Sequence, residues 1–281
     1  MSNSMSVRGP VAAPLAWLGR VGISTASYLG GLGFLVAGSS ITLWPFGRTS
    51  TSGCRGLVGE LSWMLGMGIP LSCLMHMGLG SFLAMQAYYG GTFVDGTGAV
   101  VGVGLFRNIA PLMSGLTLAG LLGARITPEL RMRNQRSNSG PLDPLSEHRI
   151  PAKLAAAMIT GPVVGLFGAC VGTVVGWRVA VGLMGITSHS FFLMFWDMLW
   201  LRDILGLFAK GVAFGLVSAA FACHEGLRGS ADDSPGTTPD AAFRAVCFAA
   251  LTIMMLNGSW FVLVYHAGPA FGPTLLKAPS A

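Results

Sequence analysis

Three ionisable side chains in this sequence lie within or beside long apolar stretches, where charge is costly. Arg107 occurs in "GLFRNIAPLMSGL", and Lys210 occurs in "RDILGLFAKGVAF", seven residues after Asp203. Ionisable groups at membrane depth usually face a bundle interior or a cavity. Asp203 and Lys210 share a helix face but stand about 10 Å apart along it, so pairing needs a bend or a third group. Lys210 then either lines a polar site, or pairs with another helix or snorkels while Asp203 lies at the outer surface.

Two amide side chains occur at similar positions in apolar segments. Asn108 follows Arg107, and Asn257 lies in "MMLNGSWF". Asn257 is suited to an interhelical hydrogen bond. Pro111, just after Arg107 and Asn108, has no N–H and should loosen the helix and free backbone carbonyls.

The sequence offers no pattern for catalysis. It contains no P-loop, HExxH or GxSxG motif, and its five cysteines include no CxxC pair. Neither a metal, a cofactor nor a catalytic residue is predicted. Any transport driven by ATP therefore requires an ATPase on another chain.

Composition indicates an integral membrane protein. Of 281 residues, 52% are hydrophobic and only 10% are charged, whereas a soluble domain is about one quarter charged. The 41 glycines suit closely packed transmembrane helices. The net charge of +6 comes without a nucleic-acid-binding motif or base-stacking aromatics, so no nucleic acid is expected. The N-terminal region does not resemble a cleaved signal peptide.

Five segments are long and apolar enough to span a membrane, which predicts an all-α fold of five transmembrane helices. Two further stretches are ambiguous: 21–47, assigned to an N-terminal helix in the inner interface, and 179–196, assigned to an outer interfacial segment. The five predicted spans are 61–89, 98–124, 154–177, 204–223 and 243–265.

Charge placement supports this count. With five spans, 12 of the 17 basic residues fall on one side of the membrane. Because basic residues mark the cytoplasmic face, the N-terminus is expected in the cytoplasm and the C-terminus outside. Counting 179–196 as a span would move Arg228 and Arg244 to the far side and weaken the asymmetry.

The loop between the second and third spans, 125–153, is the most polar segment. Its stretch "RITPELRMRNQRSNSGPLDPLSEHRIP" carries five arginines, and "SNSGP" at 137–141 predicts a turn or broken helix. Two interpretations stay open: a cytoplasmic anchor, and a docking surface for a soluble partner.

The order of these features resembles the MlaE/YrbE permeases of Mla- and Mce-type lipid ABC transporters, over roughly 57–266. "LFRNIAPLMSGLTLAG" resembles the family's Arg-Glu-Leu-Gly-Pro segment, and Glu129 in "TPEL" matches an acidic residue that closes the second span. "DPLSEHRIPAKLAAA" resembles an Asp-Pro element followed by a Pro-basic element and an alanine-rich helix. "DILGLFAKGVAFGLV" keeps the spacing between Asp203 and Lys210.

The chain departs from the family pattern at several points. The family's Glu after Arg is Asn108 here, and its polar or acidic residue in the last span is Asn257. The family's Gly-Arg in the second span reads Gly120–Leu121. The acidic coupling helix before Asp-Pro is about five residues short and reads "RNQRSNSG".

The resemblance implies a multi-pass permease of the bacterial inner (plasma) membrane. Its expected partners are an ABC ATPase subunit, Mce/MlaD-type lipid-binding proteins and a second permease subunit, and its substrate is a membrane lipid: phospholipid, sterol or fatty acid. The implied domains are a tail with an interfacial helix (1–56), the permease domain (57–266) and an extracytoplasmic tail (267–281). The candidate polar residues of the lipid cavity are Tyr88, Tyr89, Arg107, Asn108, Lys210 and Asn257. The candidate ATPase-coupling residues are Glu129, Arg131, Arg133, Arg136, Asp143 and Pro144.

A second interpretation is a structural or regulatory permease-like subunit that organises a complex without transporting, which the altered coupling segment favours. A membrane-embedded enzyme is the weakest interpretation, because no acid/base pair or metal cluster occurs at a consistent depth.

Overall fold

The computed structural model describes residues 12–43, 51–89, 97–136, 150–228 and 237–266, and every regular element among them is a helix. In chain order these are α1 (Ala12–Leu43), α2 (Thr51–Tyr89), α3 (Thr97–Gly104), the π-helix η3 (Leu105–Ile109), α4 (Ala110–Arg136), α6 (Ile150–Met184), α7 (Ser188–Met198), α8 (Leu201–Leu227), α9 (Thr237–Phe261) and the π-helix η4 (Val262–His266).

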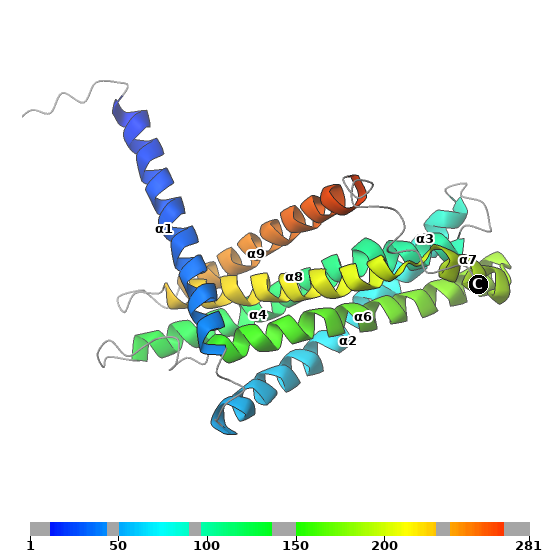
Figure 1. The fold of residues 1–281 in the computed structure, drawn as a ribbon, viewed down its shortest axis with the longest axis horizontal. Helices are drawn as coiled ribbons and strands as arrows, with labels where there is room; N and C mark the ends of the chain where they lie inside the picture. The colour runs from blue at the N-terminus through cyan, green and yellow to red at the C-terminus, as the bar shows by residue number, and fades with distance from the viewer. Residues whose placement is uncertain (1–11, 44–50, 90–96, 137–149, 229–236, 267–281) are drawn as a thin grey trace, which may run out of the picture.

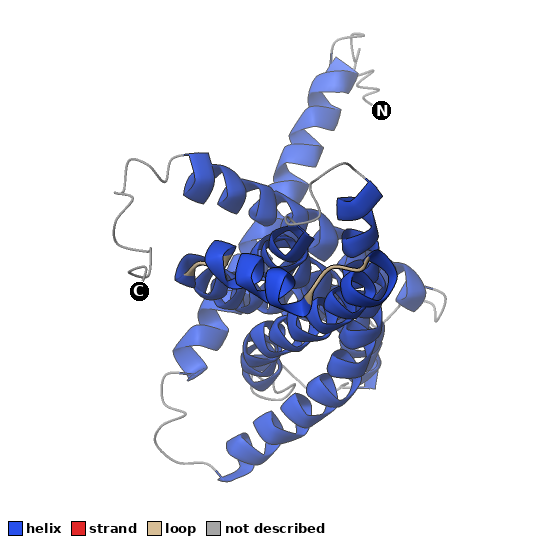
Figure 2. Cartoon of the chain, turned by 90° about the vertical axis from the view of Figure 1, so that its right-hand side faces the viewer, coloured by secondary structure: helices blue, strands red, loops and turns tan. Residues whose placement is uncertain are grey.

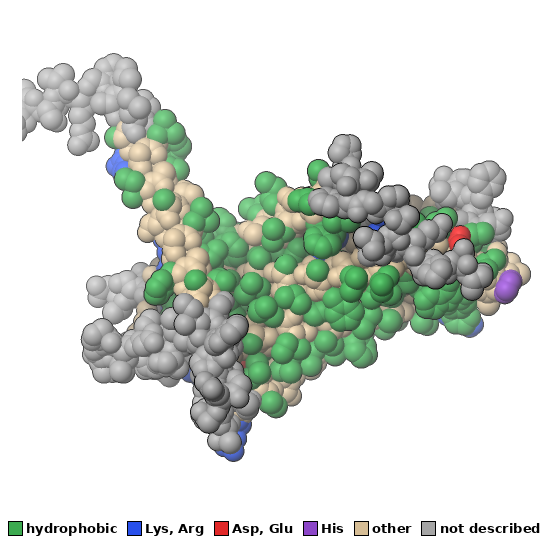
Figure 3. Space-filling model, in the orientation of Figure 1, with side chains coloured by type: hydrophobic (Ala, Val, Ile, Leu, Met, Phe, Trp, Pro, Cys, Tyr) green, Lys and Arg blue, Asp and Glu red, His purple; other side chains and the backbone are tan. Residues whose placement is uncertain are grey.

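Helices α4, α6 and α8 form the centre of an elongated bundle (Figure 1). Helix α2 packs along α6, and α9 packs along α4 and α8. More than half of the apolar spanning segment is buried in α6 and α8, whereas only 17% is buried in α2 and in α9. The long flank of the bundle is covered by hydrophobic side chains (Figure 3). Such a surface is suited to lipid, not water.

The central helices approach closely where glycines face one another. A Cβ atom added to Gly161 of α6 would overlap the carbonyl oxygen of Gly211 of α8, and one added to Gly80 of α2 would overlap that of Gly172 of α6. In lipid, helices associate through such close packing because there is no hydrophobic driving force between them. The high glycine content therefore has a structural role at these crossings.

Helix α1 differs from the other long helices in its direction. It crosses the bundle instead of running along it, as two perpendicular views show (Figures 1 and 2), and it packs mainly on α6 and α8, with Tyr28 also against Phe248 of α9. Six described helical segments are long and apolar enough to cross a membrane, and Ala16–Ser39 of α1 is one of them. The number of spans therefore stays a prediction, and the direction of α1 favours the interfacial assignment.

The structure corrects several predicted boundaries. Residues 179–184 continue α6, and the aromatic stretch after them forms α7, which at 11 residues is too short to span. Phe191 and Phe195 of α7 are buried against α3, where Gly98 admits the Phe191 backbone and Gly102 the Phe195 ring, whereas Trp196 is exposed. The placement of this segment at the outer membrane interface stays a prediction. Residues 125–136, predicted as loop, extend α4, and 51–56, assigned to the N-terminal region, begin α2. The tail 267–281 lies outside the described residues.

We predict that Gly161→Ala lowers thermal stability, whereas Gly182→Ala in the same helix does not. The new methyl group at 161 meets the backbone of α8, which cannot rotate away, and overpacking of this kind costs about 1–3 kcal/mol. A methyl group at 182 meets no atom within 4 Å. Unfolding of both variants in detergent measures the difference, and equal melting temperatures would contradict the close crossing.

Candidate functional site

Helix α8 carries charged residues near both of its ends. Asp203 lies in its first turn and Glu225 near its end, 22 residues later. That separation is about 33 Å at 1.5 Å per residue, close to the roughly 30 Å thickness of a bilayer's hydrocarbon core. The bundle therefore has two polar ends with an apolar slab between them.

At the Asp203 end, Arg107 of η3 forms a bidentate ion pair with Asp203. Arg107 Nε and Nη2 donate to the two carboxylate oxygens of Asp203, each at 2.9 Å. The Asp203 side chain is fully buried, and it also accepts the backbone N–H of Trp200 at 3.2 Å, which caps α8. Asp203 thus lies at one polar end of the bundle with its carboxylate buried against Arg107 instead of facing water, and its place at the outer membrane surface stays a prediction.

Lys210 is linked to Asp203 through the backbone of Arg107. Its Nζ donates to the carbonyl oxygen of Arg107 at 2.8 Å. In a regular α-helix that carbonyl would accept the N–H of residue 111, but Pro111 has none. The helix also widens into a π turn at Leu105–Ile109. Arg107 is thus the third group that lies between Asp203 and Lys210.

The two amides meet across the same cluster. Asn257 of α9 donates through Nδ2 to Oδ1 of Asn108 at 2.7 Å. Four of the six residues predicted to line a lipid cavity therefore lie in one cluster, which we call the Arg107 cluster: Arg107, Asn108, Asp203, Lys210 and Asn257. Asp203 was absent from the predicted set, although its spacing from Lys210 was the signal for it.

Tyr88 and Tyr89 lie apart from this cluster. They are the last residues of α2, both are exposed, and their rings contact each other at a centroid distance of 5.2 Å. The structure places them at a helix end, as expected for interfacial tyrosines. Nothing in their described contacts brings them to the polar group.

Comparison with known proteins agrees with this arrangement. The family model described as "Permease MlaE" matches residues 57–263. The chain belongs to the MlaE permease family. That match covers most of the chain, including α2 to α9, and makes it a multi-pass protein of the bacterial inner membrane with an all-helical fold.

Relatives from two genera show the extent of the similarity. The intermembrane phospholipid transport system permease protein MlaE of Haemophilus influenzae is 26% identical over 263 residues, which cover 89% of this chain and 97% of the relative. A probable ABC transporter permease protein of Rickettsia typhi is 26% identical over 165 residues, covering 56% of this chain and 64% of the relative. The matched part thus spans a little under two thirds of the Rickettsia protein.

Two positions at which the resemblance implied acidic or polar residues form one contact. Asn108 and Asn257 occupy these positions, and the two amides bond to each other. Two carboxylates at this distance would repel, and one of them would have to bind a proton. A neutral amide pair makes one hydrogen bond at these positions without charge.

At the opposite end, Lys153 is held between two glutamates. Lys153 Nζ lies 2.6 Å from Glu60 of α2 and 3.2 Å from Glu129 of α4, and its side chain is 1% exposed. Glu129 also pairs with Arg133 at 3.0 Å. This Lys153 cluster joins α2, α4 and α6. Sequence spacing did not predict this cluster, because Glu60 and Lys153 are more than 90 residues apart.

The predicted coupling residues do not form one surface. Glu129 is engaged by Lys153, and Arg131 is 4% exposed and donates to Thr237 of α9 at 3.0 Å. Arg133 is exposed, and Arg136 ends α4. Asp143 and Pro144 lie outside the described residues.

We predict that Arg107→Gln and Asp203→Asn are each strongly destabilising but that the double variant recovers much of the loss. Removing one partner leaves the other charge buried and unpaired, which costs about 3–5 kcal/mol. Asparagine at 203 still accepts the Trp200 N–H, so the cap of α8 is retained in the double variant. Thermal unfolding in nanodiscs measures the cycle, and purely additive losses would contradict a coupled pair.

Proposed function

We propose that this chain is the permease subunit of an ABC transporter that moves lipid across the cell envelope, with ATP hydrolysed by a separate subunit. The observation that carries the proposal is the Arg107 cluster. It places polar side chains from η3, α8 and α9 inside an otherwise apolar bundle, and the Arg107 side chain remains 25% exposed. A lipid carrier needs such a combination of apolar walls with a few polar groups for a headgroup.

The charges of the cluster favour an anionic headgroup. Arg107 and Asp203 neutralise each other, whereas the Lys210 ammonium lies against the Arg107 carbonyl and 5.9 Å from the Trp260 ring, which attract a cation but carry no negative charge. Because the Asn108–Asn257 pair is neutral, the cluster keeps a net positive charge. A phosphate or carboxylate brought to this site would be attracted by it.

Helix α9 offers room for an acyl chain beside the cluster. A shallow, mainly apolar hollow of about 450 Å³ lies on its outer face, next to Asn257 in the helix. Its lining residues are Met254, Met255, Gly258, Ser259, Val262 and Leu263. Methionine side chains adapt to apolar partners of varied shape, which suits a binding surface for fatty chains.

The Lys153 cluster marks the end that we assign to the cytoplasm. This assignment follows the distribution of basic residues, with five spans and α1 in the inner interface. An ATPase subunit would then contact the exposed Arg133 and residues 137–149, Mce/MlaD-type proteins would contact the Arg107 end, and a second permease would complete the cavity. Glu129 and Arg131 act in this proposal by fixing the end of α4.

We predict that Lys210→Gln lowers the anionic phospholipid that co-purifies with the protein about tenfold, because one charged hydrogen bond to the headgroup is lost. Glutamine retains a donor for the Arg107 carbonyl, so the fold should persist. Arg178→Gln, which removes an exposed charge on α6, serves as the control. Lipid phosphorus and mass spectrometry measure the content, and equal anionic lipid in both variants would remove the Arg107 cluster as the headgroup site.

We predict that replacing residues 137–149 with a Gly/Ser linker of equal length abolishes capture of the ATPase subunit and the stimulation of its hydrolysis. The described helices end before this segment and begin again after it, so the melting temperature should stay within a few degrees of the original. ATP hydrolysis by the reconstituted complex measures the effect. Undiminished stimulation would show that the ATPase is coupled elsewhere.

The competing function is a structural or regulatory subunit that organises a complex without transporting. It is favoured by the internal engagement of Glu129 and Arg131, which leaves fewer charged groups at the end of α4 for a partner. In that case the complex would assemble with this chain, but Lys210→Gln would leave lipid transfer between vesicles unchanged.

A further inference from the structure

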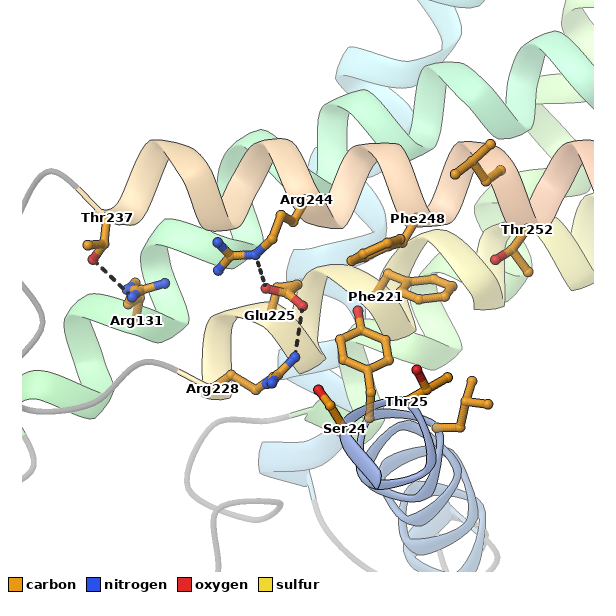
Figure 4. A pocket seen from close by; sticks show the side chains of 13 residues that line it. Ser24, Thr25, Arg131, Phe221, Glu225, Arg228, Thr237, Arg244, Phe248 and Thr252 are labelled. Atoms are coloured by element: carbon orange, nitrogen blue, oxygen red, sulfur yellow. Dashed lines mark hydrogen bonds and ion pairs between the residues drawn. The ribbon is translucent and has the colours of Figure 1, made fainter. Parts of the chain in front are cut away.

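A second cavity lies at the end of the bundle opposite the Arg107 cluster. It has a volume of about 740 Å³ and opens between α1, α4, α8 and α9 (Figure 4). None of the predicted lipid-cavity residues lines it, and only Arg131 of the predicted coupling residues does. Volumes of this size are typical of sites for small organic ligands.

One end of this cavity is basic. Arg131 of α4, Arg228 at the end of α8 and Arg244 of α9 line it, as Figure 4 shows, and Glu225 is the one acidic residue among the lining residues. Glu225 is 1% exposed and accepts Arg244 Nε at 3.1 Å, while Arg228 lies 3.7 Å away, beyond hydrogen-bond distance. The side chains of Arg228 and Arg244 are each about half exposed. Arg228 and Arg244 therefore flank one carboxylate, Arg131 adds a third guanidinium to the lining, and the cavity retains a positive excess.

Hydroxyl groups add hydrogen-bonding capacity at the same end. Thr237, Ser24 and Tyr28 line the cavity. The Tyr28 ring packs edge-on against His224 and lies 4.9 Å from the Arg228 guanidinium. Its buried hydroxyl faces the Glu225 carboxylate without completing a hydrogen bond of regular geometry. A phosphate oxygen that took the place of Glu225 could accept this donor.

The other end of the cavity is apolar and open to the flank. Phe221 of α8 and Phe248 of α9 lie one helical turn from Glu225 and Arg244 toward the middle of the bundle, and Leu29 and Leu251 are exposed at the rim. The cavity thus changes from charged to apolar over about 10 Å along α9. This gradient matches the boundary between lipid headgroups and acyl chains.

We infer that this cavity binds the phosphate headgroup of an anionic phospholipid, with the part of the acyl chains next to the headgroup against Phe221 and Phe248. Arginine pairs bidentately with phosphate oxygens, and three helices supply one arginine each. The exposed rim lets the remainder of the chains leave toward the bilayer. The bound lipid would bridge α1 to α8 and α9 and fix the direction of α1. The arginines of this site stand apart from the proposed transport site, since Arg244 lies 13 residues, or about 20 Å, before Asn257 along α9.

Glu225 provides a sharp test because its two roles predict opposite outcomes. As a structural partner of Arg244, its removal should only weaken the protein. If instead the Glu225 carboxylate competes with a lipid phosphate for the arginines, Glu225→Gln should increase the affinity for an anionic lipid, because this competition is removed. Glutamine keeps an acceptor for Arg244.

The experiment is native mass spectrometry of the full-length protein with phosphatidylglycerol and with phosphatidylcholine of the same acyl chains. We expect the original protein to form more adducts with phosphatidylglycerol than with phosphatidylcholine. Phosphatidylglycerol adducts should increase in Glu225→Gln relative to the original protein. They should fall about tenfold in the double variant Arg244→Gln/Glu225→Gln relative to Glu225→Gln. Arg125→Gln is the matched control: Arg125 is an exposed arginine at the same end, stacked on Trp63 at 3.8 Å and outside the cavity.

Three outcomes would overturn the inference. They are equal adducts of the two lipids, a loss in Arg125→Gln as large as that in the Arg244 variant, and displacement of phosphatidylglycerol by millimolar inorganic phosphate, which would indicate a site for a soluble anion. A loss of adducts in Lys210→Gln that equals the loss in the Arg244 variant would assign the lipid to the transport cluster instead. Adducts that persist in Lys210→Gln and depend on Arg244 support the second site even if the transport proposal fails.

Discussion

The bidentate ion pair between Arg107 and Asp203 is the interaction on which the polar interior of this protein depends. Asp203 caps α8 at the same time, so one carboxylate fixes the start of a central helix and neutralises a guanidinium inside the bundle. Breaking it would leave a charge in a low-dielectric environment, where the cost is several kcal/mol. The position of Lys210 follows from it, because the Arg107 backbone that Lys210 contacts is held in place by the pair.

Pro111 shows how a local defect becomes a feature of the site. By removing one N–H it leaves the Arg107 carbonyl without its regular helical donor, and the neighbouring π turn widens the helix at the same point. In a bilayer a backbone carbonyl must be hydrogen-bonded inside the protein, and Lys210 donates to this one. The cluster therefore brings together a buried anion, two cations and a backbone carbonyl.

The two ends of the bundle use charge differently. At the Arg107 end, charges and amides are paired across helices that also line an apolar surface, which supports a role in holding a transported lipid. At the other end, Lys153 is enclosed by two carboxylates and joins three helices, whereas the arginines around Glu225 remain half exposed. The first arrangement is suited to fixing helices, and the second to receiving an anion.

The sequence by itself determined that this is an all-helical membrane protein of the MlaE type, since hydrophobic segment length, glycine content and motif order are properties of the chain alone. It also identified Arg107, Asn108, Lys210 and Asn257 as unusual, because a polar residue in an apolar segment is visible without a structure. Tertiary structure alone decided which of them meet. Asn108 and Asn257 are separated by 149 residues, and local spacing carries no information about such pairs. For the same reason the Lys153 cluster and the arginine-lined cavity form only where helices distant in the chain pack side by side. Arg131 lies in a polar stretch of the sequence, yet in the structure it is buried and faces α9.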